Sequence, residues 1–230
     1  MKNNAVPVLT VDGPSGSGKG TVGQILAERL GWHFLDSGAL YRVLGIAAAK
    51  VDEKMLSDAA ALARLAGEMD IRFVPQSGGA PVRVILNGED VGDRLRTEDS
   101  GRLASMVAAV PEARAALLHK QHAFRRPPGL VADGRDMGTT VFPDAILKIF
   151  ITASPEVRAE RRYKQLKEKG FDANLPRLLD EIRERDARDV ARAASPLKPA
   201  ADACILDTSS LSISDVVDRI HAWLAERLAR

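Results

Sequence analysis

The sequence has little of what several classes of protein depend on. Only one of its 230 residues is a cysteine, Cys204, so no intrachain disulfide can form. Aromatic residues make up 4% of the chain, which leaves few rings on which nucleic-acid bases could stack. No apolar run approaches the ~20 residues that a membrane-spanning helix requires. These shortages argue against a disulfide scaffold, a single-strand-binding protein and a membrane-spanning protein.

An excess of charge of one sign is also missing. The 33 basic and 31 acidic side chains nearly cancel and leave a formal net charge of +2. A protein that held nucleic acid or a membrane surface by bulk charge would show a larger imbalance. The first residues contain no signal-peptide core before the first strand pattern begins. We therefore expect a cytoplasmic protein with no nucleic-acid or membrane partner, in which any functional positive charge is local.

Hydrophobic periodicity predicts alternating strands and helices. The first strand leads through a glycine-rich loop into a helix over residues 21–30, which ends at Gly31. Strands that alternate with helices indicate an α/β protein with a parallel sheet covered by helices on both faces. The length fits one such domain with a small insertion. The expected strands are Val8–Val11, His33–Leu35, Leu130–Ala132, Ile146–Ile151 and Cys204–Leu206.

Two segments interrupt this alternation. Residues 71–74 and 82–88 resemble the arms of a β-hairpin, with the glycine-rich turn QSGGA at 76–80 between them, and we interpret the hairpin as a small insertion. Residues 154–193 are charged and helical in pattern, with breaks near Gly170 and Pro176. The second segment therefore predicts two helices joined by a turn.

The loop GPSGSGKGT at residues 13–21 has the composition of a phosphate-binding loop. Its glycines let backbone N–H groups approach an anion, and the following helix N-terminus favours negative charge. The pattern G-x-x-x-x-G-K-[ST] is met at Gly13, Gly18 and Lys19, but Gly20 takes the eighth place and the hydroxyl follows at Thr21. This GKGT form weakens the expectation of a direct Mg²⁺–hydroxyl bond and resembles nucleoside monophosphate kinases. No NKxD-type guanine-reading motif follows, which disfavours a GTPase.

Arginines after two predicted strands indicate a second phosphate site. Arg42 follows the DSG of residues 36–38, and Arg135 follows the strand at 130–132, at the sheet edge where parallel sheets bind ligands. A phosphate acceptor is ionised near pH 7 and needs no general base, and the four histidines are scattered and interpreted as structural or exposed. Two alternatives stay open. The carboxylates beside Arg135 could form only a local ion pair, and the charged faces at 158–162 and 185–192 could be solvated surface.

Eight segments, in order along nearly the whole chain, match one family. They are residues 13–21, 35–42, 71–91, 102–114, 130–145, 158–162, 165–170 and 184–197. Together they resemble the bacterial cytidylate kinases, which phosphorylate CMP and dCMP with ATP. The segments DSGALYR and DGRDMGT are far more specific to that family than the glycine-rich loop is. The resemblance implies a P-loop kinase fold: a five-stranded parallel sheet with helices on both faces, a small β-hairpin insertion and a helical lid.

The resemblance also implies roles for the matching residues. The ATP-binding residues would be Gly13, Pro14, Ser15, Gly16, Ser17, Gly18, Lys19, Gly20, Thr21 and Arg161. The CMP-binding residues would be Ser37, Tyr41, Arg42, Ser105, Arg114, Asp133, Arg135, Asp136, Arg185, Asp189 and Arg192. The catalytic residues would be Lys19, Arg135, Arg158 and Arg162. Within the CMP set, Ser105, Arg114 and Asp136 would read the cytosine, and Arg185 and Asp189 would meet the sugar.

The family pattern further implies one P-loop kinase domain over residues 1–230. Its parts would be a core (1–62, 112–154 and 194–230), a nucleotide-monophosphate-binding insertion (63–111), and a lid with its following helix (155–193). Mg²⁺ would arrive with ATP and have no direct protein ligand, and we expect a monomer whose partners are ATP and CMP or dCMP. Two other functions stay open: phosphoryl transfer to UMP, AMP or a non-nucleotide acceptor, and binding of ATP without transfer.

Overall fold

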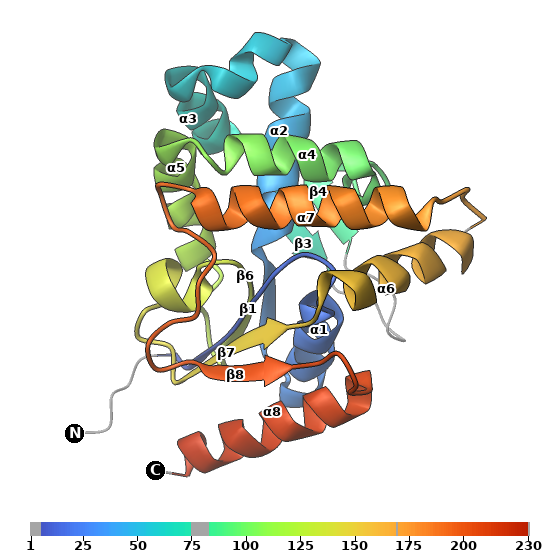
Figure 1. The fold of residues 1–230 in the computed structure, drawn as a ribbon. Coiled ribbons are helices and arrows are strands. Elements are labelled where there is room, and N and C mark those ends of the chain that lie inside the picture. The colour runs from blue at the N-terminus through green and yellow to red at the C-terminus, as the bar shows by residue number, and fades with distance from the viewer. Residues whose placement is uncertain (1–5, 75–82, 169, 230) are drawn as a thin grey trace. The chain divides into compact units, whose positions relative to one another are not determined.

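The computed structural model describes residues 6–74, 83–168 and 170–229, and the chain divides into two compact units. The first unit comprises residues 1–34 and 125–230, and the second comprises residues 35–124. Figure 1 labels the elements of both. The first unit is therefore built from two stretches of sequence that a parallel sheet brings together.

A five-stranded sheet is the frame of the first unit. Its strands lie in the order β2 (His33–Asp36), β6 (Leu130–Gly134), β1 (Val8–Asp12), β7 (Leu147–Thr152) and β8 (Cys204–Asp207). The pairs β1–β6, β1–β7 and β7–β8 are parallel, and β2 begins in the first unit and ends in the second. All five predicted strands are present, with ends that differ by one or two residues. The prediction of an α/β fold with a five-stranded parallel sheet is confirmed.

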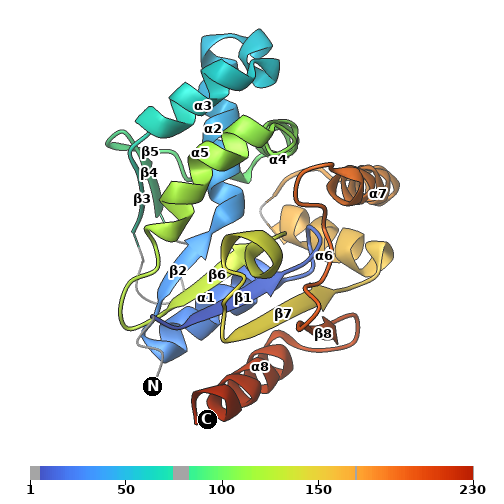
Figure 2. The same ribbon diagram turned by 90° about the vertical axis from the view of Figure 1, so that its left-hand side faces the viewer.

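The core of the first unit lies between this sheet and two helices, α1 (Lys19–Leu30) and α8 (Ile213–Leu228). Leu26 of α1 and Ile220 of α8 pack with Val11 and Ile149, which point from β1 and β7 to the same face. Figure 2 shows both helices on this side of the sheet. As predicted, α1 ends at Gly31, whose φ of 63° is a left-handed conformation that favours glycine.

A π-helical turn, η3 (Met137–Val141), lies against β1 on the other face of the sheet. Gly138 is so close to that face that a Cβ on it would lie 2.9 Å from Oγ1 of Thr10. A larger residue at position 138 would therefore push η3 away from the sheet, together with the DGRD segment that precedes it.

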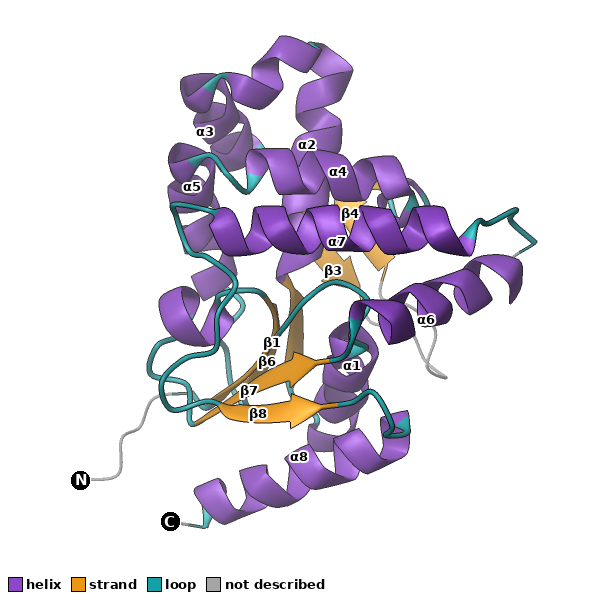
Figure 3. Ribbon diagram, viewed as in Figure 1, coloured by secondary structure: helices purple, strands orange, loops and turns teal. Residues whose placement is uncertain are grey.

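The two charged helices predicted for residues 154–193 are α6 (Pro155–Glu168) and α7 (Leu175–Ala191), and they pack against each other. Figure 3 shows the loop that joins them. The side chain of Asn174 accepts a hydrogen bond from the N–H of Arg177 and so caps α7. Pro176 lies in the first turn, where a missing N–H costs nothing, and Gly170 has a φ of 78°. The predicted break near these residues is confirmed.

The second unit combines helices with a small antiparallel sheet. Its helices are α2 (Ser37–Val51), η1 (Glu53–Ser57), α3 (Ala59–Glu68), η2 (Arg94–Arg96), α4 (Glu98–Val107) and α5 (Pro111–His122). Its strands are β3 (Ile71–Val74), β4 (Arg83–Leu86) and β5 (Glu89–Asp90), in that order. Helix α2 packs on α4 and α3 packs on α5. Along the described part of the chain, no helix is both long and apolar enough to cross a membrane.

The antiparallel pairing of β3 with β4 confirms the two arms of the predicted hairpin. The predicted turn at 76–80 lies outside the described residues. The third strand, β5, was not predicted from the sequence. Asn87 and Gly88 have φ angles of 48° and 88°, the positive values that a tight turn between β4 and β5 requires.

Candidate active site

The glycine-rich loop leaves β1 and enters α1 in the first unit. A Cβ on Gly13 would lie 2.1 Å from the carbonyl oxygen of Ile151, so only glycine fits there. Gly16, with a φ of 77°, supplies a left-handed turn, and Oγ of Ser17 donates a hydrogen bond to the carbonyl of Pro14 at 3.0 Å. Gly18 at the N-cap has no side chain, so the first N–H groups of α1 can bind an anion. The loop has the form that phosphate binding requires.

Lys19 lies buried at this loop beside an acid from β6. Its Nζ donates a hydrogen bond to the carbonyl of Pro14 at 3.2 Å and lies 3.9 Å from Oδ1 of Asp133. A Cβ on Gly20 would lie 3.1 Å from the other carboxylate oxygen of Asp133. A serine or threonine at position 20 would therefore crowd the Asp133 carboxylate, which would have to shift by a few tenths of an ångström. This contact gives a physical reason for the GKGT form of the motif.

A second buried carboxylate, Asp12, anchors the segment that follows β6. Its two oxygens accept hydrogen bonds from the N–H groups of Met137 at 2.9 Å and Gly138 at 2.8 Å. Because these residues begin η3, Asp12 fixes the backbone directly after Arg135 and Asp136. The sequence analysis did not identify Asp12. An acid directly before Gly13 was the available signal, but its partners lie 125 and 126 residues away.

Burial raises the pKa of Asp12 to about 6. The N–H groups of Gly138 and Met137 act in the opposite direction, because they favour the ionised carboxylate, and so does the charge of Lys19. The negative charge of Asp136 adds to the rise in pKa. The folded protein therefore holds this proton more tightly than the unfolded chain, whose aspartate has a pKa near 3.8.

This difference in pKa predicts a pH-dependent stability. Between pH 4 and 6 the folded state binds more protons at Asp12 than the unfolded state, so the Asp12 contribution to the free energy of unfolding falls as pH rises. The total change should be on the order of 3 kcal/mol. Denaturant unfolding of the unmodified protein and of Asp12→Asn, at several pH values, measures it. The difference in the free energy of unfolding between the two proteins should fall between pH 4 and 6 and stay level above pH 6. A difference that does not change with pH would contradict the raised pKa of Asp12.

Arginines from two elements converge on Asp189. The Asp189 carboxylate accepts hydrogen bonds from Nε of Arg135 at 2.8 Å and from Nη2 of Arg192 at 2.7 Å. Burial alone would raise the pKa of Asp189, but the charges of Arg135, Arg192 and Arg185 lower it below its usual value. Arg185 and Asp189 lie on α7, as the helical pattern of this segment predicted, whereas Arg192 lies just beyond the last helical residue, Ala191, so the predicted helical face does not extend to it. Three guanidinium groups around one carboxylate leave an excess of positive charge, which suits a phosphate.

Two arginines of α6 bind the carbonyl oxygens of the glycine-rich loop. Arg158 donates to the carbonyl of Ser15 at 3.0 Å, and Arg161 donates to the carbonyl of Ser17 at 3.4 Å. Arg161 also donates to the carbonyl of Thr208, a residue of the loop after β8 that the sequence analysis did not single out. Arg162, on the same helix, is half-buried. Helix α6 is thus attached to the loop on which a triphosphate would lie.

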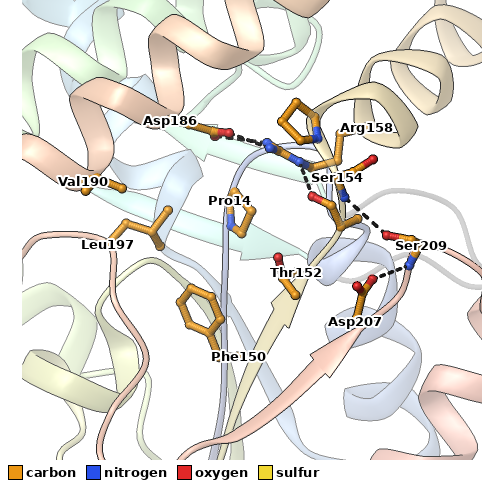
Figure 4. A pocket seen from close by; sticks show the side chains of 12 residues that line it. Pro14, Phe150, Thr152, Ser154, Arg158, Asp186, Val190, Leu197, Asp207 and Ser209 are labelled. Atoms are coloured by element: carbon orange, nitrogen blue, oxygen red, sulfur yellow. Dashed lines mark hydrogen bonds and ion pairs between the residues drawn. The ribbon is translucent and has the colours of Figure 1, made fainter.

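A cavity of about 450 Å³ lies beside these contacts. Figure 4 shows Pro14, Phe150 and Leu197 on one side of the cavity, and the hydrogen-bonded pair of Arg158 and Asp186 above them. The cavity therefore has walls from the glycine-rich loop, β7, α6, α7 and the end of β8, and its polar lining includes the ion pair of Arg158 and Asp186 together with Asp207 and Ser209.

The second unit holds the remaining predicted CMP-binding residues. The guanidinium carbon of Arg114 lies 5.5 Å from the ring centroid of Tyr41, so a cation–π contact brings these two predicted CMP-binding residues together. Arg42 donates hydrogen bonds to the carbonyl of Leu95 and, at 3.4 Å, to Oγ of Ser100. Ser37 is buried in the first turn of α2, and Ser105 is half-buried on α4. No sequence pattern predicts the Arg42 contacts, because they join residues more than fifty positions apart.

A loop of this geometry between a parallel strand and a helix, with a buried lysine and a separate arginine cluster, defines a P-loop kinase. The family model of the cytidylate kinases matches residues 9–226, and the chain belongs to the cytidylate kinase family. It is therefore an enzyme, a nucleoside monophosphate kinase.

Curated relatives agree with this assignment. The chain is 56% identical over 222 residues to the cytidylate kinase of Aeromonas salmonicida, which covers 96% of this chain and 95% of the relative. It is 57% identical over 227 residues to the cytidylate kinase of Pseudomonas putida, covering 98% of each chain. Among solved structures, a gluconokinase from Sinorhizobium meliloti is 17% identical with a TM-score of 0.46, covering 96% of this chain and 93% of that one. The family assignment depends on the sequence matches.

Proposed function

We propose that this enzyme transfers the γ-phosphoryl group of ATP to CMP and dCMP and forms CDP and dCDP. One observation carries the proposal beyond membership of the family. Strands β1 and β6 pair in parallel with Asp12 opposite Gly134, so the loop that begins at Gly13 and the segment that begins at Arg135 leave the sheet side by side. A donor triphosphate on the first and an acceptor phosphate at the second would be neighbours.

On the donor side, we assign the triphosphate to residues 13–21 and Arg161. Lys19 lies in this loop and would follow the transferring phosphoryl group with its positive charge. Arg135 and Arg162 would neutralise the charge that spreads over the equatorial oxygens in the transition state. Arg158 stays a predicted catalytic residue on sequence grounds.

On the acceptor side, we assign the CMP phosphate to Ser37, Arg42, Arg135 and Arg192. The hydrogen bonds that join Arg135 and Arg192 to Asp189 support this, because they hold two guanidinium groups at one place before any ligand binds. The roles of Arg185 and Asp189 at the sugar and of Tyr41 and Asp133 beside the nucleotide stay predictions. Cytosine would be read by Ser105, Arg114 and Asp136.

The reaction needs positioning more than it needs a base. An oxygen of the CMP phosphate, ionised near pH 7, would attack the γ-phosphorus in line with the leaving oxygen of ADP. The helices of the predicted lid, residues 155–193, would close over ATP and exclude water that would otherwise hydrolyse it.

Mg²⁺ would come with ATP as the phosphoryl donor. Within residues 6–74, 83–168 and 170–229, no cluster of three or more histidine, cysteine, aspartate or glutamate side chains could hold a metal ion. Gly20 offers no hydroxyl, and the nearest carboxylate is that of Asp133. These residues fit a metal that enters with the nucleotide, and the Asp133 carboxylate would contact its bound water. When bound, Mg²⁺ would neutralise phosphate charge.

A coupled ADP-release assay with CMP, dCMP, UMP and AMP side by side tests the function. CMP and dCMP should support turnover, and UMP and AMP should have values of kcat/KM lower by about 100-fold or more, because a site built to hydrogen-bond one base rejects another. Faster turnover with UMP or AMP would favour a different acceptor. ATP binding without CMP-dependent turnover would contradict a kinase and favour a nucleotide-binding protein.

We also propose that the enzyme acts as a cytoplasmic monomer with the three predicted parts. The compact unit of residues 35–124 contains the whole predicted insertion, 63–111, which supports a separate nucleotide-monophosphate-binding part. The predicted lid, 155–193, consists of α6 and α7 with their connecting loop. Size-exclusion chromatography with light scattering would measure the oligomeric state.

A further inference from the structure

Arg158 is held in place by four hydrogen bonds to three residues. Its Nε donates a hydrogen bond to the carbonyl of Ala153 at 2.9 Å, and its Nη1 donates to the carbonyl of Ser15 and to Oδ1 of Asp186, each at 3.0 Å. Its Nη2 donates to the other oxygen of Asp186. Figure 4 shows this paired contact with Asp186. An arginine has five N–H groups, so four of them are used within the protein.

Burial reinforces this arrangement. Arg158 is 2% exposed, and its Cβ lies 3.3 Å from the position that a Cβ on Gly16 would take. The stem of Arg158 is therefore packed against the glycine-rich loop, and its charged end is satisfied by α7. With four of its five N–H groups already used, Arg158 could donate several hydrogen bonds to a nucleotide only after its contacts with Asp186 had broken.

The contact with Ser15 bears on how the loop presents its N–H groups. In a planar trans peptide the C=O and the following N–H point in opposite directions. Because the carbonyl of Ser15 points to Arg158, the N–H of Gly16 points away from Arg158. The same reasoning applies to Arg161, the carbonyl of Ser17 and the N–H of Gly18. Arginines outside the loop thus orient donors toward the side where a phosphate would bind.

We propose that Arg158 and Asp186 form a positioning pair that holds the glycine-rich loop in its ATP-binding shape, so that Asp186, which lies on α7, determines the affinity for ATP. The inference rests on the proposed function, because it names a residue that acts on the same reaction through the loop. It assigns Asp186 a role that the sequence did not reveal, and it makes Arg158 a positioning residue. Direct contact between Arg158 and ATP is the rival explanation.

A double-mutant cycle separates the two explanations. The variants are Asp186→Ala, Arg158→Ala and the double substitution, with Asp186→Glu as the conservative replacement. For each, kcat, the KM values for ATP and CMP, and the melting temperature are measured. The dissociation constant for ATP is measured by equilibrium dialysis without CMP, so a protein that binds ATP but does not transfer it can still be tested.

Each alanine variant should bind ATP about 10- to 100-fold more weakly, because a loop displaced by an ångström loses its aligned donors. The double variant should be no worse than the weaker-binding single variant, since both changes break one unit. The KM for CMP should change less than about twofold, because a substitution that acts on one site leaves an independent site unaffected. Asp186→Glu should recover part of the ATP affinity, because it keeps a carboxylate.

The opposite pattern would overturn the proposal. If Arg158 acts directly on ATP, Asp186→Ala should leave ATP affinity unchanged or raise it, and the two effects should add. If the pair only stabilises the fold, the melting temperature and kcat should fall while the dissociation constant for ATP stays the same. Absence of CMP-dependent turnover in the unmodified protein would instead count against the proposed function and leave the ATP-binding cycle valid.

The chain contains a matched control on the same two helices. Arg183 of α7 and Glu156 of α6 form an ion pair of 2.8 Å, and both side chains are exposed. This pair joins α6 to α7 as Arg158 and Asp186 do, but at the surface. Glu156→Gln should change ATP affinity by less than about twofold, because exposed ion pairs contribute little. A loss equal to that of Asp186→Ala would assign the effect to general helix packing and contradict the proposal.

Discussion

Replacing Lys19 with alanine should lower kcat on the order of 100- to 1,000-fold, the loss that follows removal of one aligned charge-stabilising donor. Lys19 is buried in the loop that would hold the triphosphate, and its Nζ has a backbone partner in the carbonyl of Pro14. The charge on Lys19 would matter most when the phosphoryl group is in transit, so kcat should fall more than ATP affinity does. Steady-state kinetics of CMP phosphorylation measures both.

The Lys19 variant should remain folded. Lys19→Ala leaves the Asp133 carboxylate buried without this partner, which should lower the melting temperature, but the pair is long, at 3.9 Å, so the loss should not unfold the domain. Circular dichroism and the melting temperature check this point. Lys54→Ala, a change of an exposed lysine on η1, is the matched control and should leave turnover unaltered. Near-normal turnover in Lys19→Ala would show that another group carries the charge.

Replacing Asp136 with asparagine should reduce the preference for CMP over UMP by about 100-fold, because the base would lose a hydrogen bond to a charged acceptor and the penalty against uracil would weaken. The Asp136 carboxylate is 3% exposed. A carboxylate accepts hydrogen bonds from the amino group of cytosine, whereas uracil presents a carbonyl oxygen at that place. An asparagine NH₂ can donate to that carbonyl, so UMP should gain while CMP loses.

The measurement is the ratio of kcat/KM for CMP to that for UMP. Asp144→Asn offers a control from the same part of the chain, since Asp144 is exposed and pairs with Arg125 at 2.7 Å. Its ratio should equal that of the unmodified enzyme. An unchanged ratio in Asp136→Asn would remove Asp136 from base recognition and leave the task to Ser105 and Arg114.

The sequence by itself predicted the frame of this protein. Strand and helix periods, the glycine at position 31 and the breaks at Gly170 and Pro176 are local patterns, and local patterns set where elements begin and end. The glycine-rich loop could be recognised for the same reason, because its glycines and Lys19 lie within nine consecutive residues. Eight segments in order along the chain were enough to suggest the family, which the family model confirms.

Only the tertiary structure determined which residues that are distant in sequence form hydrogen bonds and ion pairs with one another. The sequence predicted a charged helical segment that contains Arg185 and Asp189, but not that Arg135 donates to the carboxylate of Asp189 across 54 positions. Nothing near Asp12 in the sequence identifies the N–H groups of Met137 and Gly138 as its partners. A buried charge must find donors or opposite charges, yet the fold alone decides which ones come within reach.

The glycine-rich loop also depends partly on its own sequence and partly on the tertiary structure. Its sequence determined that it could bind a phosphate, because glycine is the residue that allows such close approach. The surroundings of the loop add further constraints. The carbonyl of Ile151 occupies the place of a Cβ on Gly13, and the Asp133 carboxylate would be in tight contact with a Cβ at position 20. Arg158, paired with Asp186, donates a hydrogen bond to the loop. These constraints come from β7, β6, α6 and α7, which approach the loop only once the sheet has formed.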